Sequence, residues 1–161
     1  MNRPALLLQT TCALLTASIA SAIAADMSPF TGTWTIARSV EAPWKEPDNP
    51  VGTREDRAVA GKTVVFAAGA VRGPSPIGCT KPVYNIETVP ADGIFEGMLG
   101  EPRKHLPKPD AAAAATRLGF ADPAHIVRLD PGCTEIMFAV VQPGTLAFAL
   151  NNRVYYLTRR P

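Results

Sequence analysis

The amino-acid sequence predicts an all-β protein, an antiparallel β-barrel of about eight strands with one short helix inserted before the last four strands. Short runs rich in β-branched and aromatic residues alternate apolar and polar positions, as half-buried strands do. Turn dipeptides such as Pro143-Gly144 and Asn151-Asn152 separate the last of these runs, and strands joined by tight turns are antiparallel. A closed or nearly closed barrel fits this pattern, and a two-sheet sandwich is the alternative.

Residues 1–25 have the features of an export signal. Arg3 supplies the positive start, an apolar segment follows, and Ala22-Ile23-Ala24 is a small-x-small cleavage site, so that the mature chain begins at Ala25 or Asp26. A membrane anchor is the alternative, but polar residues dilute the apolar run and the cleavage site follows it directly. We therefore expect a periplasmic or secreted protein with no membrane span after cleavage.

The expected mature chain, residues 26–161, suits one domain with one core. The full sequence has 16 lysines and arginines, and loss of Arg3 leaves 15 of them against 14 acidic residues. The net charge is therefore close to neutral, and no cluster of lysines and arginines runs along one face. We therefore expect no nucleic-acid partner. We expect a monomer.

Cleavage of the signal would reduce three cysteines to two, Cys79 and Cys133. In an oxidising compartment an even pair predicts a disulfide bond, and closure of this loop would contribute about 4 kcal/mol in the chain-entropy model. A catalytic cysteine is the alternative. It needs a positioned base, and neither His105 nor His125 stands in a recognisable motif.

The first strand is expected between residues 30 and 44, where even positions such as Trp34 and Ile36 are apolar and odd positions are small or polar. Arg38 interrupts the apolar row. Either it marks a polar spot inside a pocket, or the strand bulges there and turns the side chain outward. The bulge is favoured because isolated charges are rarely buried.

The middle of the chain is expected to hold shorter elements. Thr53 is expected to cap one helical turn, and Cys79 is expected in a loop. The predicted strands cover residues 62–67, 70–72, 82–89 and 94–99. Asp110 is a plausible N-cap for a helix over residues 111–118, which Gly119 would end.

The last third of the sequence predicts a four-stranded meander. The four strands are expected at residues 126–130, 135–141, 145–150 and 153–159. Pro-Gly suits a type II turn, and Asn-Asn suits a two-residue hairpin that needs positive φ.

Gly32-Thr33-Trp34 at the first strand and an arginine in the last strand resemble the pattern of the calycins, which include the lipocalins and small secreted bacterial barrels. The resemblance implies that Gly32 and Trp34 are structural residues and that Trp34 closes one end of the barrel. It also implies that Arg159 or Arg160 packs across the indole ring as a cation–π partner. The chain lacks the long helix that follows the barrel of true lipocalins. Its size is similar to that of periplasmic barrels that inhibit proteases or lysozyme.

The sequence contains no motif that predicts catalysis or cofactor binding. A Gly-x-Ser-x-Gly elbow, a glycine-rich phosphate loop and metal-ligand spacing are all missing. We therefore expect no metal, no cofactor and no enzyme. A hydrolase whose site assembles from distant residues is the weaker alternative.

Two functional hypotheses follow from these observations. In the first, the proline-rich loops 43–50 and 101–109 engage a protein partner such as a hydrolase, with Arg38, Trp44 and His105 as possible contacts, because stiff loops lose less entropy on binding. In the second, the barrel interior carries a small apolar ligand between Ile36, Phe66, Phe138 and Phe148. The alternative to a carrier is a solid core, which small barrels usually have.

Overall fold

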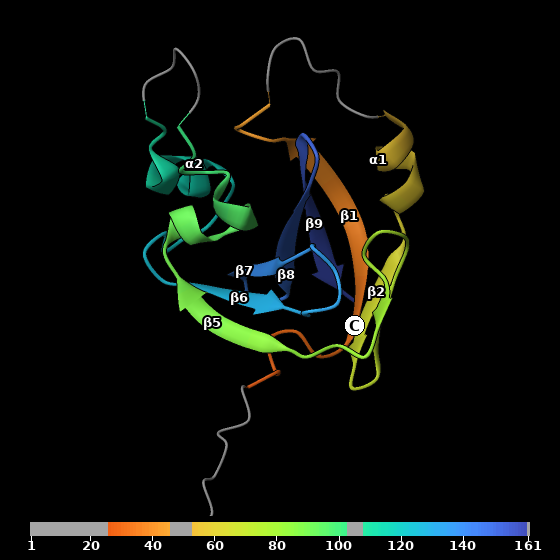
Figure 1. Cartoon of the computed structure of the whole chain (residues 1–161). Helices are drawn as coiled ribbons and strands as arrows, with labels where there is room; N and C mark the ends of the chain where they lie inside the picture. Colours follow the sequence, from red (N-terminus) through yellow and green to blue (C-terminus); the bar gives the residue numbers. More distant parts are fainter. Residues whose placement is uncertain (1–25, 46–52, 103–107, 161) are drawn as a thin grey trace, which may run out of the picture.

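The computed structural model describes residues 26–45, 53–102 and 108–160. Its strands form one antiparallel sheet in the order β4-β3-β2-β1-β9-β8-β7-β6-β5, which curls into a half-barrel (Figure 1). The strands are β1 (Thr33–Glu41), β2 (Thr63–Ala67), β3 (Ala70–Arg72), β4 (Cys79–Thr80), β5 (Asn85–Val89), β6 (Ile126–Asp130), β7 (Phe138–Gln142), β8 (Thr145–Leu150) and β9 (Arg153–Arg159). The all-β, antiparallel, barrel-like class is confirmed, with nine strands in these ranges rather than about eight.

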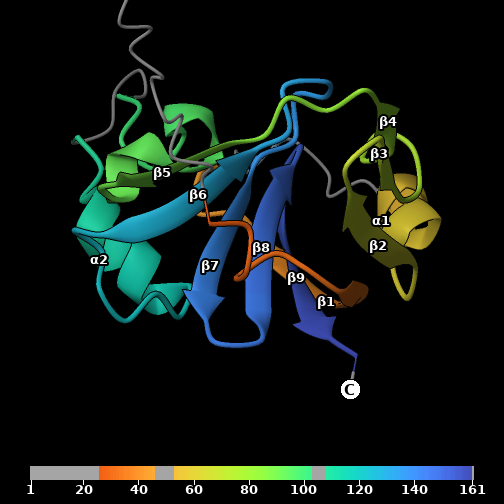
Figure 2. The same cartoon turned by 90° about the horizontal axis from the view of Figure 1, so that it is seen from below.

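In the described ranges, two α-helices and two 3-10 turns accompany the sheet. They are α1 (Thr53–Val59), α2 (Ala111–Arg117), η1 (Ala91–Gly93) and η2 (Phe95–Gly97). α1 and α2 lie on opposite sides of the molecule (Figures 1 and 2). None of the helices in the described ranges has the length and apolar character needed to cross a membrane.

The predicted meander is confirmed at β6, β8 and β9, whose bounds match the expected ranges. The turn residues take the conformations that their chemistry favours, with φ of +76° at Gly144 and +52° at Asn151. β7 begins at Phe138 instead of residue 135. The connection before β7 is therefore longer than a tight turn, and it contains Cys133.

Two predictions in the middle of the chain are wrong. Residues 94–99 form no strand, because Phe95, Glu96 and Gly97 all have positive φ and the chain turns there. Their alternating sequence resembles a strand, but Ile94, Phe95 and Leu99 are buried together in one cluster. Cys79 lies in the short strand β4 rather than in a loop.

A register shift in β1 changes the face of the sheet to which the apolar side chains of this strand point. It lies between Ile36 and Arg38 in the pairing of β1 with β9, where the sequence favoured a bulge. Before the shift, Ile36 faces the inside of the half-barrel, and after it Val40 and Ala42 pack on the outside. Arg38 therefore lies exposed on the outer face.

Each face of the sheet carries its own apolar cluster. The inner cluster fills the half-barrel and consists of Phe30, Trp34, Ile36, Val59, Val64, Phe66, Val71, Ile77, Leu129, Ile136, Phe138, Leu146, Phe148, Tyr155 and Leu157. The outer cluster joins α2, η1 and η2 to the sheet and contains Trp44, Ile94, Phe95, Leu99, Leu118, Phe120, Val141, Val154 and Tyr156 among others. The sheet is therefore covered by an apolar cluster on each of its two faces.

The predicted disulfide bond is confirmed, and it joins the two ends of the sheet. Cys79 belongs to β4 at one end of the strand order, and Cys133 follows β6 near the other end, with a Cα–Cα distance of 5.8 Å. The Tyr84 hydroxyl donates to the Ala67 carbonyl oxygen at 2.8 Å. The disulfide and this hydrogen bond therefore connect the β2–β4 end of the sheet to the segments beside β5 and β6, at the other end of the strand order.

Candidate functional site

Gly32, Trp34 and Arg159 lie together where β1 begins. Trp34 is fully buried, and its indole Nε1 donates to the Phe30 carbonyl oxygen at 2.7 Å. The guanidinium of Arg159 covers the ring, whereas Arg160 turns its Nε to Thr35 Oγ1 at 2.7 Å. Gly32 has a φ of +119°, which a larger residue rarely adopts. These contacts are structural.

Trp44 belongs to the outer core rather than to the surface. It is 5% exposed, its ring lies 5.7 Å from the Phe95 ring, and its Nε1 donates to the Asn151 carbonyl oxygen at 3.0 Å. We therefore assign it no role in partner contact. His105, residues 46–50 of the first proline-rich loop and residues 103–107 of the second lie outside the described residues.

Arg38 lines an open cavity of about 510 Å³ between β1, the end of α2 and β9. We call it the arginine pocket. It is lined by Arg38, Val40, Glu41, Pro43, Arg117, Leu118, Gly119 and Tyr156. It combines two cations with apolar surface, as ligand sites with a few polar groups do.

Arg38 is stacked on the ring of Tyr156. Its guanidinium carbon lies 3.5 Å from the ring centroid, and the two residues are opposite each other in the pairing of β1 with β9. The Tyr156 hydroxyl donates to the Leu118 carbonyl oxygen at 2.8 Å, which fixes the buried ring against the end of α2. Burial raises the pKa of Tyr156, and the nearby Arg38 charge lowers it in part.

The end of α2 brings Arg117 to the pocket. Asp110 caps the helix, since its Oδ1 accepts from the Ala113 backbone N–H at 2.9 Å. Gly119, with a φ of +98°, ends it as predicted. The last-turn carbonyl oxygens of Ala114 and Thr116 accept bonds from the backbone N–H groups that follow.

The charges around the pocket do not balance. Glu41 pairs with Lys45 at 3.2 Å. Among the described residues, neither Arg38 nor Arg117 forms an ion pair with a carboxylate. Glu41 lines the same cavity but neither arginine is paired with a described carboxylate, and arginine remains charged at any physiological pH.

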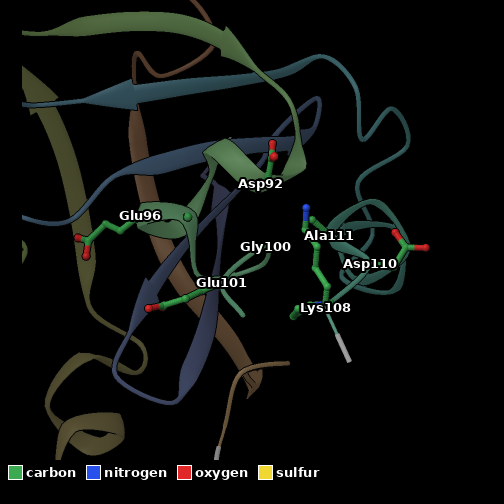
Figure 3. Close-up of a pocket in the computed structure, with 9 residues that line it drawn as sticks. Asp92, Glu96, Gly100, Glu101, Lys108, Asp110 and Ala111 are labelled. Carbon is green, nitrogen blue, oxygen red and sulfur yellow. The ribbon is translucent and has the colours of Figure 1, made fainter. Parts of the chain in front are cut away.

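A second open cavity, of about 620 Å³, has mostly acidic charges in its lining. Asp92, Glu96, Glu101 and Asp110 contribute carboxylates, and Lys108 contributes a cation. In Figure 3 the side chains of Glu96 and Glu101 extend to the left, and that of Asp110 extends to the right, away from them. Within the described part of the chain, no three His, Cys, Asp or Glu residues are grouped to hold a metal.

The inside of the half-barrel is filled by side chains. The residues expected to line a carrier cavity, Ile36, Phe66, Phe138 and Phe148, are at most 7% exposed. The Phe66 and Phe138 rings lie 4.8 Å apart, and those of Phe138 and Phe148 lie 5.7 Å apart. These distances are typical of packed aromatic pairs, so this part of the interior is a solid core.

No protein-family model, curated protein or solved structure matches this chain. Function must therefore be inferred from the residues themselves. Of the two candidate contacts that lie in the described residues, Arg38 is exposed and Trp44 is buried. Arg117 and Tyr156 were not identified, because nothing local to them signals that they meet Arg38.

Proposed function

We propose that this protein is an exported, non-catalytic β-barrel binding protein that engages a protein partner, such as a hydrolase that it inhibits. The observation that carries the proposal is the arginine pocket, where exposed Arg38 is held on Tyr156 beside Arg117 with no carboxylate partner among the described residues. Arginine and tyrosine are enriched among the residues that dominate protein interfaces. The pocket therefore forms the centre of the proposed contact surface.

Export and the calycin-like character belong to the same proposal. The signal-like residues 1–25 and the Cys79–Cys133 disulfide support a periplasmic or secreted location. The Gly32-Thr33-Trp34 segment with Arg159 over the indole supports kinship with small secreted calycin barrels. A carrier of a small apolar ligand gains no support from the filled interior around Phe138.

Site-specific photo-crosslinking in the cells that produce the protein tests the proposal. A benzophenone amino acid replaces Thr116, which is exposed beside Arg117 on α2, and in a matched variant it replaces Val83, which is 78% exposed. We expect one discrete adduct with another protein from position 116 and none from position 83. Adding Arg38→Gln to the Thr116 variant should abolish the adduct.

Two results would contradict the proposal. One is the same set of adducts from both positions, since that would indicate contact by chance collision. The other is no adduct from position 116 at expression levels that match those of the native protein. Mass spectrometry of a discrete adduct identifies the partner, and an activity assay of that partner with and without the barrel protein tests inhibition.

A further inference from the structure

We infer that the arginine pocket is a carboxylate-binding site, in which Arg38 and Arg117 receive an aspartate or glutamate side chain of an acidic peptide segment. The inference rests on the proposed function and names the chemistry that the partner must present.

Arg38 is preorganised for binding a planar anion. Stacking on the Tyr156 ring at 3.5 Å fixes the plane of the guanidinium, and the hydrogen bond from Tyr156 to Leu118 fixes the ring. A stacked guanidinium keeps N–H donors along its edges, and that edge matches the two oxygens of a carboxylate. Because the side chain is already held, binding costs less rotamer entropy.

Arg117 adds a second cation from a separate element of the fold. It lies in the last turn of α2, and both arginines line the same cavity. Two like charges that share a pocket repel each other, and an anion between them relieves this repulsion. Among the described residues no carboxylate forms an ion pair with either arginine, and Glu41 of the same lining pairs with Lys45 instead.

The rest of the lining favours a carboxylate on a peptide over a free phosphate. Val40, which is partly exposed, offers apolar surface to the methylene groups of an acidic side chain. Glu41 stands at the rim and holds its own negative charge beside Lys45. Inorganic phosphate has no methylene groups, so it gains nothing from contact with Val40. A cavity of about 510 Å³ also has room for a peptide side chain and its neighbours.

NMR titration of the mature protein tests the inference directly. The probes are a short glutamate–glycine peptide with blocked ends, the same peptide with glutamine for glutamate, and inorganic phosphate. We expect the glutamate peptide to shift the side-chain Nε–H resonances of Arg38 and Arg117. The glutamine peptide should leave them unmoved, and phosphate should bind more weakly than the glutamate peptide.

Charge variants identify the residues responsible. Arg38→Gln and Arg117→Gln should each weaken peptide binding by about 10-fold, the order expected for loss of one charge-assisted pair. Arg38→Lys keeps the charge and should still weaken binding, because lysine lacks the planar fork. Arg72→Gln, which removes an exposed arginine from β3, serves as the matched control and should bind as the native protein does. Unchanged backbone resonances away from the pocket verify that each variant folds.

The outcomes separate this inference from the proposed function. Equal binding of the glutamate and glutamine peptides, tighter binding of phosphate, or an equal effect of Arg72→Gln would overturn the carboxylate assignment. A discrete adduct from position 116 without peptide binding would also overturn it and leave the proposed function standing. Peptide binding that depends on Arg38, without any adduct, would instead refute the proposed protein partner.

Discussion

The guanidinium carbon of Arg159 lies 4.8 Å from the centroid of the Trp34 ring. The two residues are direct partners in the pairing of β1 with β9, so the register of the sheet places the cation over the indole. Arg159 also donates to the carbonyl oxygens of Ser28 and Pro29, at 3.2 and 2.8 Å. One side chain thus joins the last strand, the first strand and the segment that precedes it.

Trp34→Ala is expected to lower the free energy of unfolding by about 3–5 kcal/mol, the range for a large-to-small change in a packed core. Trp34 is fully buried in the inner cluster, and the substitution leaves a cavity and removes its hydrogen bond to Phe30. Urea denaturation followed by circular dichroism measures the loss. A variant as stable as the native protein would show that Trp34 does not organise this end of the barrel.

Arg159→Ala provides the matched comparison. Because Arg159 is exposed, the cation–π contact should contribute only about 0.5–1 kcal/mol, with a further small loss from its hydrogen bonds. Comparing the losses of unfolding free energy in Trp34→Ala and Arg159→Ala separates the contribution of the packed indole from that of the arginine that covers it. A loss as large as that of Trp34→Ala would mean that the arginine, and not the indole, holds the end of the barrel together.

The regular part of the fold was predictable because its signals are local. β2, β3 and the meander β6–β9 combine strand alternation with turn dipeptides, and both act over a few residues. Residues 94–99 have the same alternation, yet the positive φ values at Phe95 and Glu96 turn the chain. β4 consists of only Cys79 and Thr80, which is too short to show a pattern of alternation. A segment this short gives no local sign that it pairs with β3.

The arginine pocket was predictable only in part. Arg38 stood out because it breaks an apolar row, which is a local irregularity. Its neighbours Arg117 and Tyr156 come from α2 and β9, and only the docking of α2 and the bulge in β1 bring them together. Trp44 was predicted as a contact because it follows Pro43 in a proline-rich segment. The outer cluster buries it instead.

Replacement of Cys79 and Cys133 by serine is expected to cost about 4 kcal/mol of stability, since a sequence separation of 54 closes a long loop in the unfolded chain. The bond also joins the two ends of the sheet. Urea denaturation under oxidising conditions measures the loss. A reducing agent should destabilise the native protein to a similar degree and should leave the double variant unchanged. Sensitivity of the double variant to the reducing agent would contradict this account.

Asp110→Ala is expected to destabilise the protein by about 1 kcal/mol, because it removes the side-chain cap of α2. Asp110→Asn keeps an acceptor oxygen and should lose much less. Urea denaturation compares the two variants at neutral pH. An equal loss in both would indicate that the charge of Asp110, rather than its hydrogen bond to the Ala113 N–H, stabilises the helix.

Stability is expected to fall as the pH rises above about 10, because burial raises the pKa of Tyr156 and of Tyr84 above the ordinary value of 10.0. The neutral phenol is the favoured form in the fold, so the unfolded chain releases these protons first. Between the unfolded and folded pKa values the unfolded state holds fewer protons, and the free energy of unfolding therefore declines. Below the unfolded pKa this contribution is fully present.

Tyr156→Phe should make the alkaline decline shallower, and adding Tyr84→Phe should make it shallower still. At neutral pH, Tyr156→Phe should itself cost about 1 kcal/mol, because it removes the hydrogen bond to Leu118.

Arg38→Gln should have the opposite effect and make the alkaline decline in stability steeper. The Arg38 charge lowers the pKa of Tyr156, so its removal raises that pKa further and steepens the decline. Ultraviolet titration of the phenolate with parallel urea denaturation measures both effects, and a slope that Arg38→Gln leaves unchanged would show that the stacked guanidinium does not stabilise the phenolate.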